Sequence, residues 1–223
     1  MLVLVIDTST PAVTAGLAEV DASGGSHLLA ERVSTDPRRH GELLAPAVDA
    51  ALAAAGRVPS DLGAVVAGLG PGPYTGLRIG LVTAAALAGA LDLPAYGVCS
   101  LDAIAHAQST AVDAPAGEGP VLVATDARRR EVYWATYDHR GRRLTGPAVG
   151  RPADVDATGC RLACGAGALL YDLGLPTGPP LFPPAAALAA LAADRIAGRA
   201  RPEQLTPLYL RRPDAMEPSA ARA

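Results

Sequence analysis

The stretch LVLVIDTST (residues 2–10) decides the fold, because it has a counterpart in VLVATDARRR (residues 121–130). Each is a run of consecutive apolar residues, typical of a strand buried on both faces, and each then reaches an aspartate, Asp7 or Asp126. A second, more alternating segment follows each aspartate, so both regions are predicted β-hairpins. The repeat predicts an α/β protein of two lobes, each a mixed sheet led by a β-hairpin and flanked by helices.

The lobes are expected at residues 1–110 and 111–213, with a flexible tail at 214–223. Further strands are expected at residues 26–34, 62–70 and 93–99, and helices at residues 40–56, 75–91, 100–110 and 184–200. Gly56 is a predicted helix stop, and Ser100 is a predicted N-cap. Pro46 is tolerated best in a first turn, so the helix at 40–56 is expected to begin near it.

The loop GLGPGPYTGLRIGL (residues 68–81) has the glycines of a nucleotide-binding loop but not their spacing. Pro71 and Pro73 remove two backbone N–H groups that a phosphate cradle would use. The chain contains no lysine, since all 19 of its basic residues are arginine, and this excludes P-loop and Schiff-base chemistry. A tight turn leading into a helix is the favoured interpretation.

The helix after this loop carries small residues at every fourth position: Gly76, Gly80 and Ala84. Glycine inside a helix costs about 1 kcal/mol relative to alanine, so something must offset that cost. A stripe without side chains lets another helix approach closely. Either a helix of the same lobe or a partner protein is expected to pack there.

Two sets of polar residues are candidate catalytic sites. Asp7 and Asp126 end the first strand of each lobe and could hold a magnesium-bound nucleotide between the lobes, with Thr8, Ser9 and Arg128 in the turns that follow. The alternative is that both aspartates are structural. His40 has Leu44 where a metal pair on one helix face would need a second histidine, so no metal site is expected.

The net charge of −3 gives no overall electrostatic signal for nucleic acid, although the arginines gather in small clusters. Of the three cysteines, Cys160 and Cys164 are spaced as C-x3-C, but no second pair of Cys or His residues lies near them in the sequence. Free thiols are therefore expected rather than a zinc site. The short apolar N-terminus reads as a strand rather than a signal peptide, and no membrane span is expected. A cytoplasmic location is therefore expected.

Taken together, VIDTST, RRHGELLAPAVDAAL, GLGPGPYTGLRIGL, DARRREVYWATY and PLYLRRPDA resemble the TsaB (YeaZ) family over residues 2–215. The resemblance implies a two-lobed fold of the actin/Hsp70/sugar-kinase (ASKHA, RNase H-like) type. It also implies a role in forming N6-threonylcarbamoyladenosine (t6A) at position 37 of tRNAs that read ANN codons. Members of this family are non-catalytic paralogues of TsaD, which carries the metal site, and they act with TsaD and the ATPase TsaE.

The resemblance thus assigns ATP, magnesium and the metal to partner subunits, with no cofactor bound by this chain alone. TsaD-like chains carry H-x3-H on their first helix, of which only His40 is present here. The two helices at 40–55 and 76–91 are the predicted partner face, meeting TsaD or, in its absence, a second copy of this chain. The predicted interface residues are His40, Leu43, Leu44, Ala47, Gly76, Leu77, Gly80, Leu81 and Ala84.

Three other functions are also compatible with the sequence. The first is an ATP-dependent transferase or kinase of the same fold, using Asp7 and Asp126. The second is a glycoprotease-like metallopeptidase, which the missing second histidine disfavours. The third is a tRNA-binding module, since the arginines at residues 128–130 and 140–143 could contact RNA inside a complex.

Overall fold

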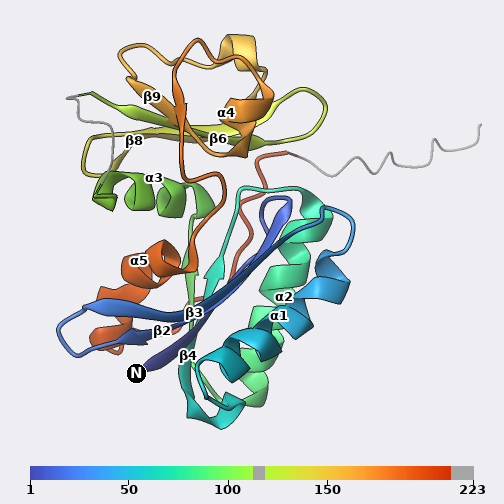
Figure 1. Ribbon diagram of the computed structural model, residues 1–223, viewed down its shortest axis with the longest axis vertical. Coiled ribbons are helices and arrows are strands. Elements are labelled where there is room, and N and C mark those ends of the chain that lie inside the picture. Colours follow the sequence, from blue (N-terminus) through green and yellow to red (C-terminus); the bar gives the residue numbers. More distant parts are fainter. Residues whose placement is uncertain (113–118, 212–223) are drawn as a thin grey trace, which may run out of the picture.

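A computed structural model describes residues 1–112 and 119–211 of the chain. It contains two five-stranded sheets, one in each of two lobes stacked end to end (Figure 1). This confirms the predicted two-lobed α/β architecture. The tail expected at residues 214–223 lies outside the described residues.

The sheet of the first lobe has the strand order β3-β2-β1-β4-β5. Its strands are β1 (Leu2–Asp7), β2 (Ala12–Val20), β3 (Ser26–Thr35), β4 (Leu62–Gly68) and β5 (Ala95–Val98). The first three are antiparallel, whereas β4 and β5 run parallel to β1. Strand β1 is therefore central and buried on both faces, as its unbroken apolar sequence predicts.

The sheet of the second lobe repeats this arrangement in the order β10-β9-β6-β7-β8. Its strands are β6 (Val121–Asp126), β7 (Val132–Tyr137), β8 (Arg143–Gly150), β9 (Leu162–Cys164) and β10 (Thr177–Gly178). Strand β6 pairs antiparallel with β7 and parallel with β9, as β1 does with β2 and β4. The predicted repeat of a hairpin-led sheet is therefore confirmed.

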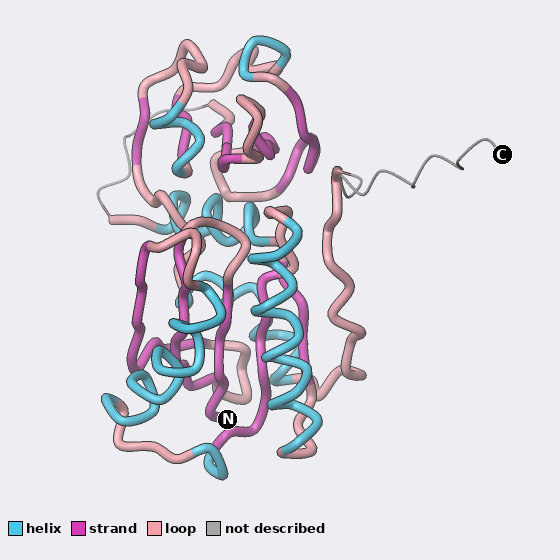
Figure 2. Tube along the Cα trace, turned by 90° about the vertical axis from the view of Figure 1, so that its right-hand side faces the viewer, coloured by secondary structure: helices cyan, strands magenta, loops and turns pink. Residues whose placement is uncertain are grey.

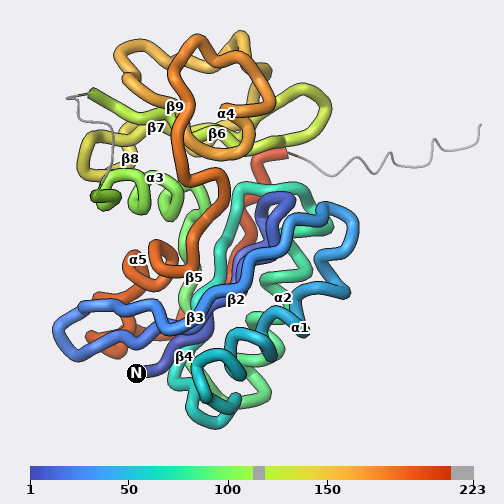
Figure 3. Tube along the Cα trace, viewed as in Figure 1, coloured from blue at the N-terminus to red at the C-terminus, as the bar shows by residue number. Residues whose placement is uncertain are grey.

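Helices cover both faces of the first sheet (Figures 1 and 3). The helices in the described residues are α1 (His40–Ala54), α2 (Tyr74–Ala90), α3 (Ser100–Thr110), α4 (Ala166–Leu170) and α5 (Ala185–Ala197), with short 3-10 turns at Pro59–Asp61 and Pro152–Asp154. Helices α1 and α2 pack against the face of β1 that carries Leu4 and Ile6. Helix α5 packs against the opposite face, which carries Val3 and Val5.

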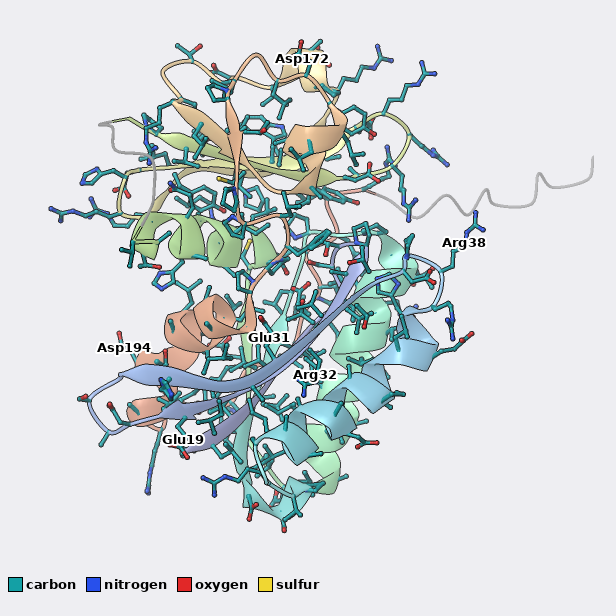
Figure 4. The ribbon with its side chains drawn as sticks, viewed as in Figure 1. Glu19, Glu31, Arg32, Arg38, Asp172 and Asp194 are labelled. Carbon is teal, nitrogen blue, oxygen red and sulfur yellow. The ribbon has the colours of Figure 1, made fainter. Side chains whose placement is uncertain are left out.

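Helix α5 falls within the range expected for the second lobe but packs on the sheet of the first. Its Ala185 Cβ lies 2.4 Å from where a Cβ on Gly16 would stand, so only glycine fits in β2 there. The Ala185 N–H donates to the carboxylate of Glu31 at 2.7 Å, and Figure 4 shows Glu31 on the strand beneath this helix. The chain then runs back as residues 198–211 along β5 to the junction of the lobes (Figure 2).

Two local predictions were wrong. Helix α1 begins at His40 rather than near Pro46. Pro46 has no N–H to donate to the Glu42 carbonyl, but both residues are exposed, so the proline is tolerated inside the helix. Cys99 rather than Ser100 precedes α3, since the Ser100 hydroxyl is engaged by Asp7 of β1.

In the described part of the chain, no helix combines the length and apolar character needed to span a bilayer.

Candidate functional site

Asp7 lies at the end of β1 and is only 1% exposed. One carboxylate oxygen accepts the Ser9 N–H at 2.9 Å and the Ser9 hydroxyl at 2.8 Å, and the other accepts the Ser100 hydroxyl at 2.5 Å. Burial raises the pKa of Asp7, and the hydrogen bonds from Ser100 and Ser9 oppose this rise. Both oxygens are thus held by the chain itself.

Thr8 joins the turn after β1 to helix α2. Its hydroxyl donates to the carbonyl of Gly76 at 2.7 Å and accepts the N–H of Gly80 at 3.0 Å. A Cβ on Gly80 would stand 2.3 Å from the Thr8 Oγ1 atom, closer than real contacts allow. The glycine stripe therefore receives a turn of this same chain, and that contact offsets the helical cost of its glycines.

This packing changes the interpretation of the predicted interface. Its buried members are His40, Leu44, Ala47, Leu77, Gly80, Leu81 and Ala84. Leu43 and Gly76 are half-buried. In this conformation the set forms the inner side of α1 and α2 and cannot form their outer surface. His40 donates from Nε2 to the carbonyl of Thr10 at 2.8 Å, so this buried ring nitrogen has a hydrogen-bond partner within the chain.

The glycine-rich loop before α2 packs tightly rather than opening around a ligand. Gly70 has a φ of +87°, and its N–H donates to the Ser100 hydroxyl at 3.1 Å. A Cβ on Gly72 would stand 2.2 Å from the Ser9 carbonyl oxygen, so glycine is required for this approach. The Tyr133 hydroxyl of the second lobe donates to the Gly72 carbonyl at 3.4 Å. The loop is thus a tight turn at the junction of the lobes.

Asp126 occupies the position in the second lobe that Asp7 occupies in the first. It accepts the Arg128 N–H at 2.9 Å and the Tyr171 hydroxyl at 3.2 Å, and its other oxygen lies 3.9 Å from the Arg128 guanidinium. Its side chain is 13% exposed, and that of Arg128 is 53% exposed. This turn therefore faces solvent at its tip.

The turn after Asp126 has a strained backbone. Arg128, Arg129 and Arg130 have φ values of 64°, 53° and 61°, a left-handed region that costs a non-glycine residue roughly 1–2 kcal/mol. Arg211 braces the turn from residues 198–211, since it donates to the Ala127 carbonyl and pairs with Glu131. Sequence reasoning identified the arginines but not this conformation, which depends on that distant brace.

A cavity of about 210 Å³ lies between the glycine-rich loop and the turn after Asp126. Its lining includes Tyr74, Tyr133, Tyr209, Arg128 and Arg211. A second hollow, of about 250 Å³, shares Tyr74 and Arg128 with it and reaches Thr8 and His40. Three of the six tyrosines of the chain therefore converge on one cavity, and sequence reasoning assigned none of them a role. Each tyrosine belongs to one of the segments that carry the family resemblance, but these segments are far apart in the sequence, so no local pattern indicates that the rings meet.

The geometry limits the chemistry of this region. In the two described ranges, no three His, Cys, Asp or Glu side chains are grouped so that they could hold a metal ion. Cys99, Cys160 and Cys164 are free thiols, as predicted. Arginine and tyrosine side chains instead dominate the cleft, and these bind anions and planar groups.

Comparison with known proteins identifies relatives of this chain. The family model described as TsaD, tRNA N6-adenosine threonylcarbamoyltransferase, matches residues 27–168. An uncharacterized Mycobacterium bovis protein is 49% identical over 213 residues, which cover 96% of this chain and 93% of that protein. The TsaB protein of Escherichia coli, named for tRNA threonylcarbamoyladenosine biosynthesis, is 36% identical over 61% of this chain and 55% of its own length.

Solved structures agree with these matches. YeaZ from Pseudomonas aeruginosa superposes with a TM-score of 0.72 at 30% identity, covering 94% of this chain and 99% of that one. An uncharacterized protein of the same organism, described as similar to the peptidase YeaZ, gives a TM-score of 0.75 at 30% identity. The chain spans only about half the length of some relatives, such as an uncharacterized Mycobacterium leprae protein, of which it covers 56%.

Proposed function

Because this chain belongs to the TsaB (YeaZ) family, we propose that it is a non-catalytic subunit required for t6A formation in tRNA. In this proposal it acts as a scaffold and activator of the threonylcarbamoyltransferase TsaD, together with TsaE. It binds no nucleotide or metal by itself, and its partners supply ATP, magnesium and the catalytic metal. A role in tRNA modification also locates it in the cytoplasm.

The observation that carries this proposal is the composition of helix α2. Only one of its 17 residues, Arg78, is charged, although about half of the helix is solvent-exposed. A surface helix normally carries charged or polar residues on its outer side. An apolar outer side is typical of a helix that a partner covers.

The outer side of α2 differs from the stripe predicted from the sequence. The outer stripe contains Val82, Ala86 and Gly89, and Val82 is 60% exposed. Helix α1 lies beside α2 and adds the exposed Gly41 and Ala45. We call these five residues the outer α1/α2 face. A partner helix would pack on it without disturbing the Thr8 contact beneath.

TsaD is the proposed occupant of the outer α1/α2 face in the complex, and a second copy of this chain occupies it when TsaD is absent. The kinase-like alternative needs Asp7 to bind a magnesium-bound nucleotide, but its oxygens are already occupied by Ser9 and Ser100. The metallopeptidase alternative needs a partner for His40, and that histidine is bonded to Thr10.

A matched pair of valines tests the partner face. Val82→Arg places a charge on the outer α1/α2 face, whereas Val58→Arg places one at a site of similar exposure, 55%, outside it. We expect Val82→Arg to abolish co-purification with the cognate TsaD and Val58→Arg to leave it intact. Retention of TsaD by a folded Val82→Arg chain would contradict the proposal. Substitution of Gly80 is no test, because it would damage the Thr8 contact within the chain.

A further inference from the structure

Three adjoining hollows meet at Tyr74, at the mouth of the cleft between the lobes. The first two are the cavities described above, and the third lies along α2 between Tyr74 and Val82. Their lining includes four arginines: Arg78, Arg128, Arg129 and Arg211. No aspartate or glutamate lines any of the three within the described residues, and the carboxylates that pair with Arg128 and Arg211, Asp126 and Glu131, lie outside the linings. The linings themselves are therefore basic in a chain of net charge −3.

Aromatic rings stand among these arginines. Tyr74 and Tyr209 are stacked with ring centroids 5.0 Å apart, and they are 43% and 40% exposed. The guanidinium of Arg78 lies 5.1 Å from the centre of the Tyr74 ring. Two exposed, stacked tyrosines are an unusual surface in a chain that is only 4% aromatic. They offer a flat face to another planar group.

The arginines are presented by a backbone that is fixed in place. Arg128 and Arg129 stand on the left-handed turn that Asp126 and Arg211 hold. Strain that the surrounding structure maintains is typical of functional sites rather than of ordinary surface turns. Arg38 adds a further cation at the end of the first lobe nearest the second (Figure 4).

We propose that this mouth binds a single-stranded segment of RNA, with bases stacked on Tyr209 and Tyr74 and phosphates held by Arg128 and Arg129. Aromatic platforms within a basic groove are the general means of binding single strands. RNA is most often recognised at loops whose bases are unstacked. The inference rests on the proposed function, which supplies tRNA as the RNA, and it assigns direct tRNA contact to this chain.

The position of the mouth is compatible with an assembly in which this chain contacts RNA and TsaD at the same time. Tyr74 is the first residue of α2, and the outer stripe of this helix, which belongs to the outer α1/α2 face, begins at Val82, about two turns further along. RNA stacked on Tyr74 and Tyr209 would therefore lie beside the proposed TsaD surface, and only the third hollow, which Val82 lines, reaches that surface. Neither Arg128 nor Tyr209 belongs to that face, so they can be changed without touching it.

The test measures binding of a fluorescein-labelled, unmodified tRNA transcript by anisotropy, with the full chain alone and mixed with TsaD. We expect Arg128→Glu/Arg129→Glu to weaken binding about tenfold or more and to lower the slope of log K against log salt by about 1 to 2. Tyr209→Ala should weaken binding about tenfold, and Tyr209→Phe should restore it because stacking is kept. Unfolding midpoints verify that each variant is folded.

Arg151→Glu/Arg201→Glu is the matched control, since it makes the same charge change at two exposed arginines that line none of the three hollows. It should bind tRNA within about twofold of the wild type. Equal binding by both double variants would overturn the inference, as would no tRNA binding by the wild-type chain in either setting. The proposed function fails separately, if the wild-type chain does not restore t6A in cells that lack its counterpart.

Discussion

The two lobes have the same strand order, yet they treat the turn after the first strand in opposite ways. In each lobe a helix glycine packs on the end of that strand: Gly80 on Thr8, and Gly167 of α4 on the backbone of Ala124 and Thr125. The first lobe closes this turn with a helix of 17 residues, whereas α4 has five. Asp7 is consequently sealed, while the turn after Asp126 extends its arginines into the cleft.

The difference shows how the same strand order can produce one closed turn and one exposed turn. In the turn after β1, the Asp7 carboxylate and the Thr8 and Ser9 hydroxyls all make hydrogen bonds within the chain, and these bonds join β1 to α2 and α3. The second turn is braced but exposed, so its side chains remain accessible. The two turns are therefore not equivalent, and substitutions at Asp7 and in the arginine turn should have different effects.

The largest difference should come from removing the two aspartates. Asp7→Ala leaves the buried Ser9 and Ser100 hydroxyls without their acceptor, so we expect a loss of about 3 kcal/mol in the free energy of unfolding. Asp126→Ala should cost about 1 kcal/mol, since its partners reach water more easily. Urea denaturation of the two variants measures both values, and equal losses would break the comparison.

Two glycines of α2 provide the next contrast. Gly80→Ala pushes a methyl group into Thr8, so we expect a loss of about 2 kcal/mol. Gly89→Ala meets nothing within 4 Å on the exposed side of the same helix, so it should gain up to about 1 kcal/mol from helix propensity. Thermal or urea unfolding gives the sign of each change. A gain at both positions would mean that Thr8 does not occupy the stripe.

The smallest effect concerns pH. The pKa of Asp7 is raised above 3.8 in the folded state, so its contribution to stability is fully present below that pH and declines as the pH rises through the folded pKa. As the pH rises from 3.8 through the folded pKa of Asp7, the free energy of unfolding of the wild type should therefore fall relative to that of Asp7→Asn, and the difference should then level off. Urea midpoints at several pH values measure it, and the opposite slope would show an Asp7 that favours its charged form.

The sequence predicted the strands and the repeat well because both rest on local apolar patterns. It did not predict which side of α2 faces the core. Nearly every residue of that helix is apolar or small, so the pattern gives no preferred face, and the buried stripe was predicted as the interface. The helix itself, ending at Ala90, lies within one residue of the predicted range.

Other misses depend on contacts between distant residues. Ser100 is the residue type typical of an N-cap, but it is the first residue of α3, and its hydroxyl donates to Asp7, 93 positions away. Helix α5 has a clear apolar stripe, and nothing local indicates that it packs on the first sheet. Tyr74, Tyr133 and Tyr209 meet only because residues 198–211 return to the lobe junction.

The central claim is that this chain works through its outer α1/α2 face and not through a catalytic Asp7. The direct test is t6A in bulk tRNA from cells that lack the counterpart of this chain and carry either Asp7→Asn or Val82→Arg. With both variants folded, we predict that Asp7→Asn restores t6A to the wild-type level and that Val82→Arg does not. The reverse result, t6A with Val82→Arg and none with Asp7→Asn, would contradict the account.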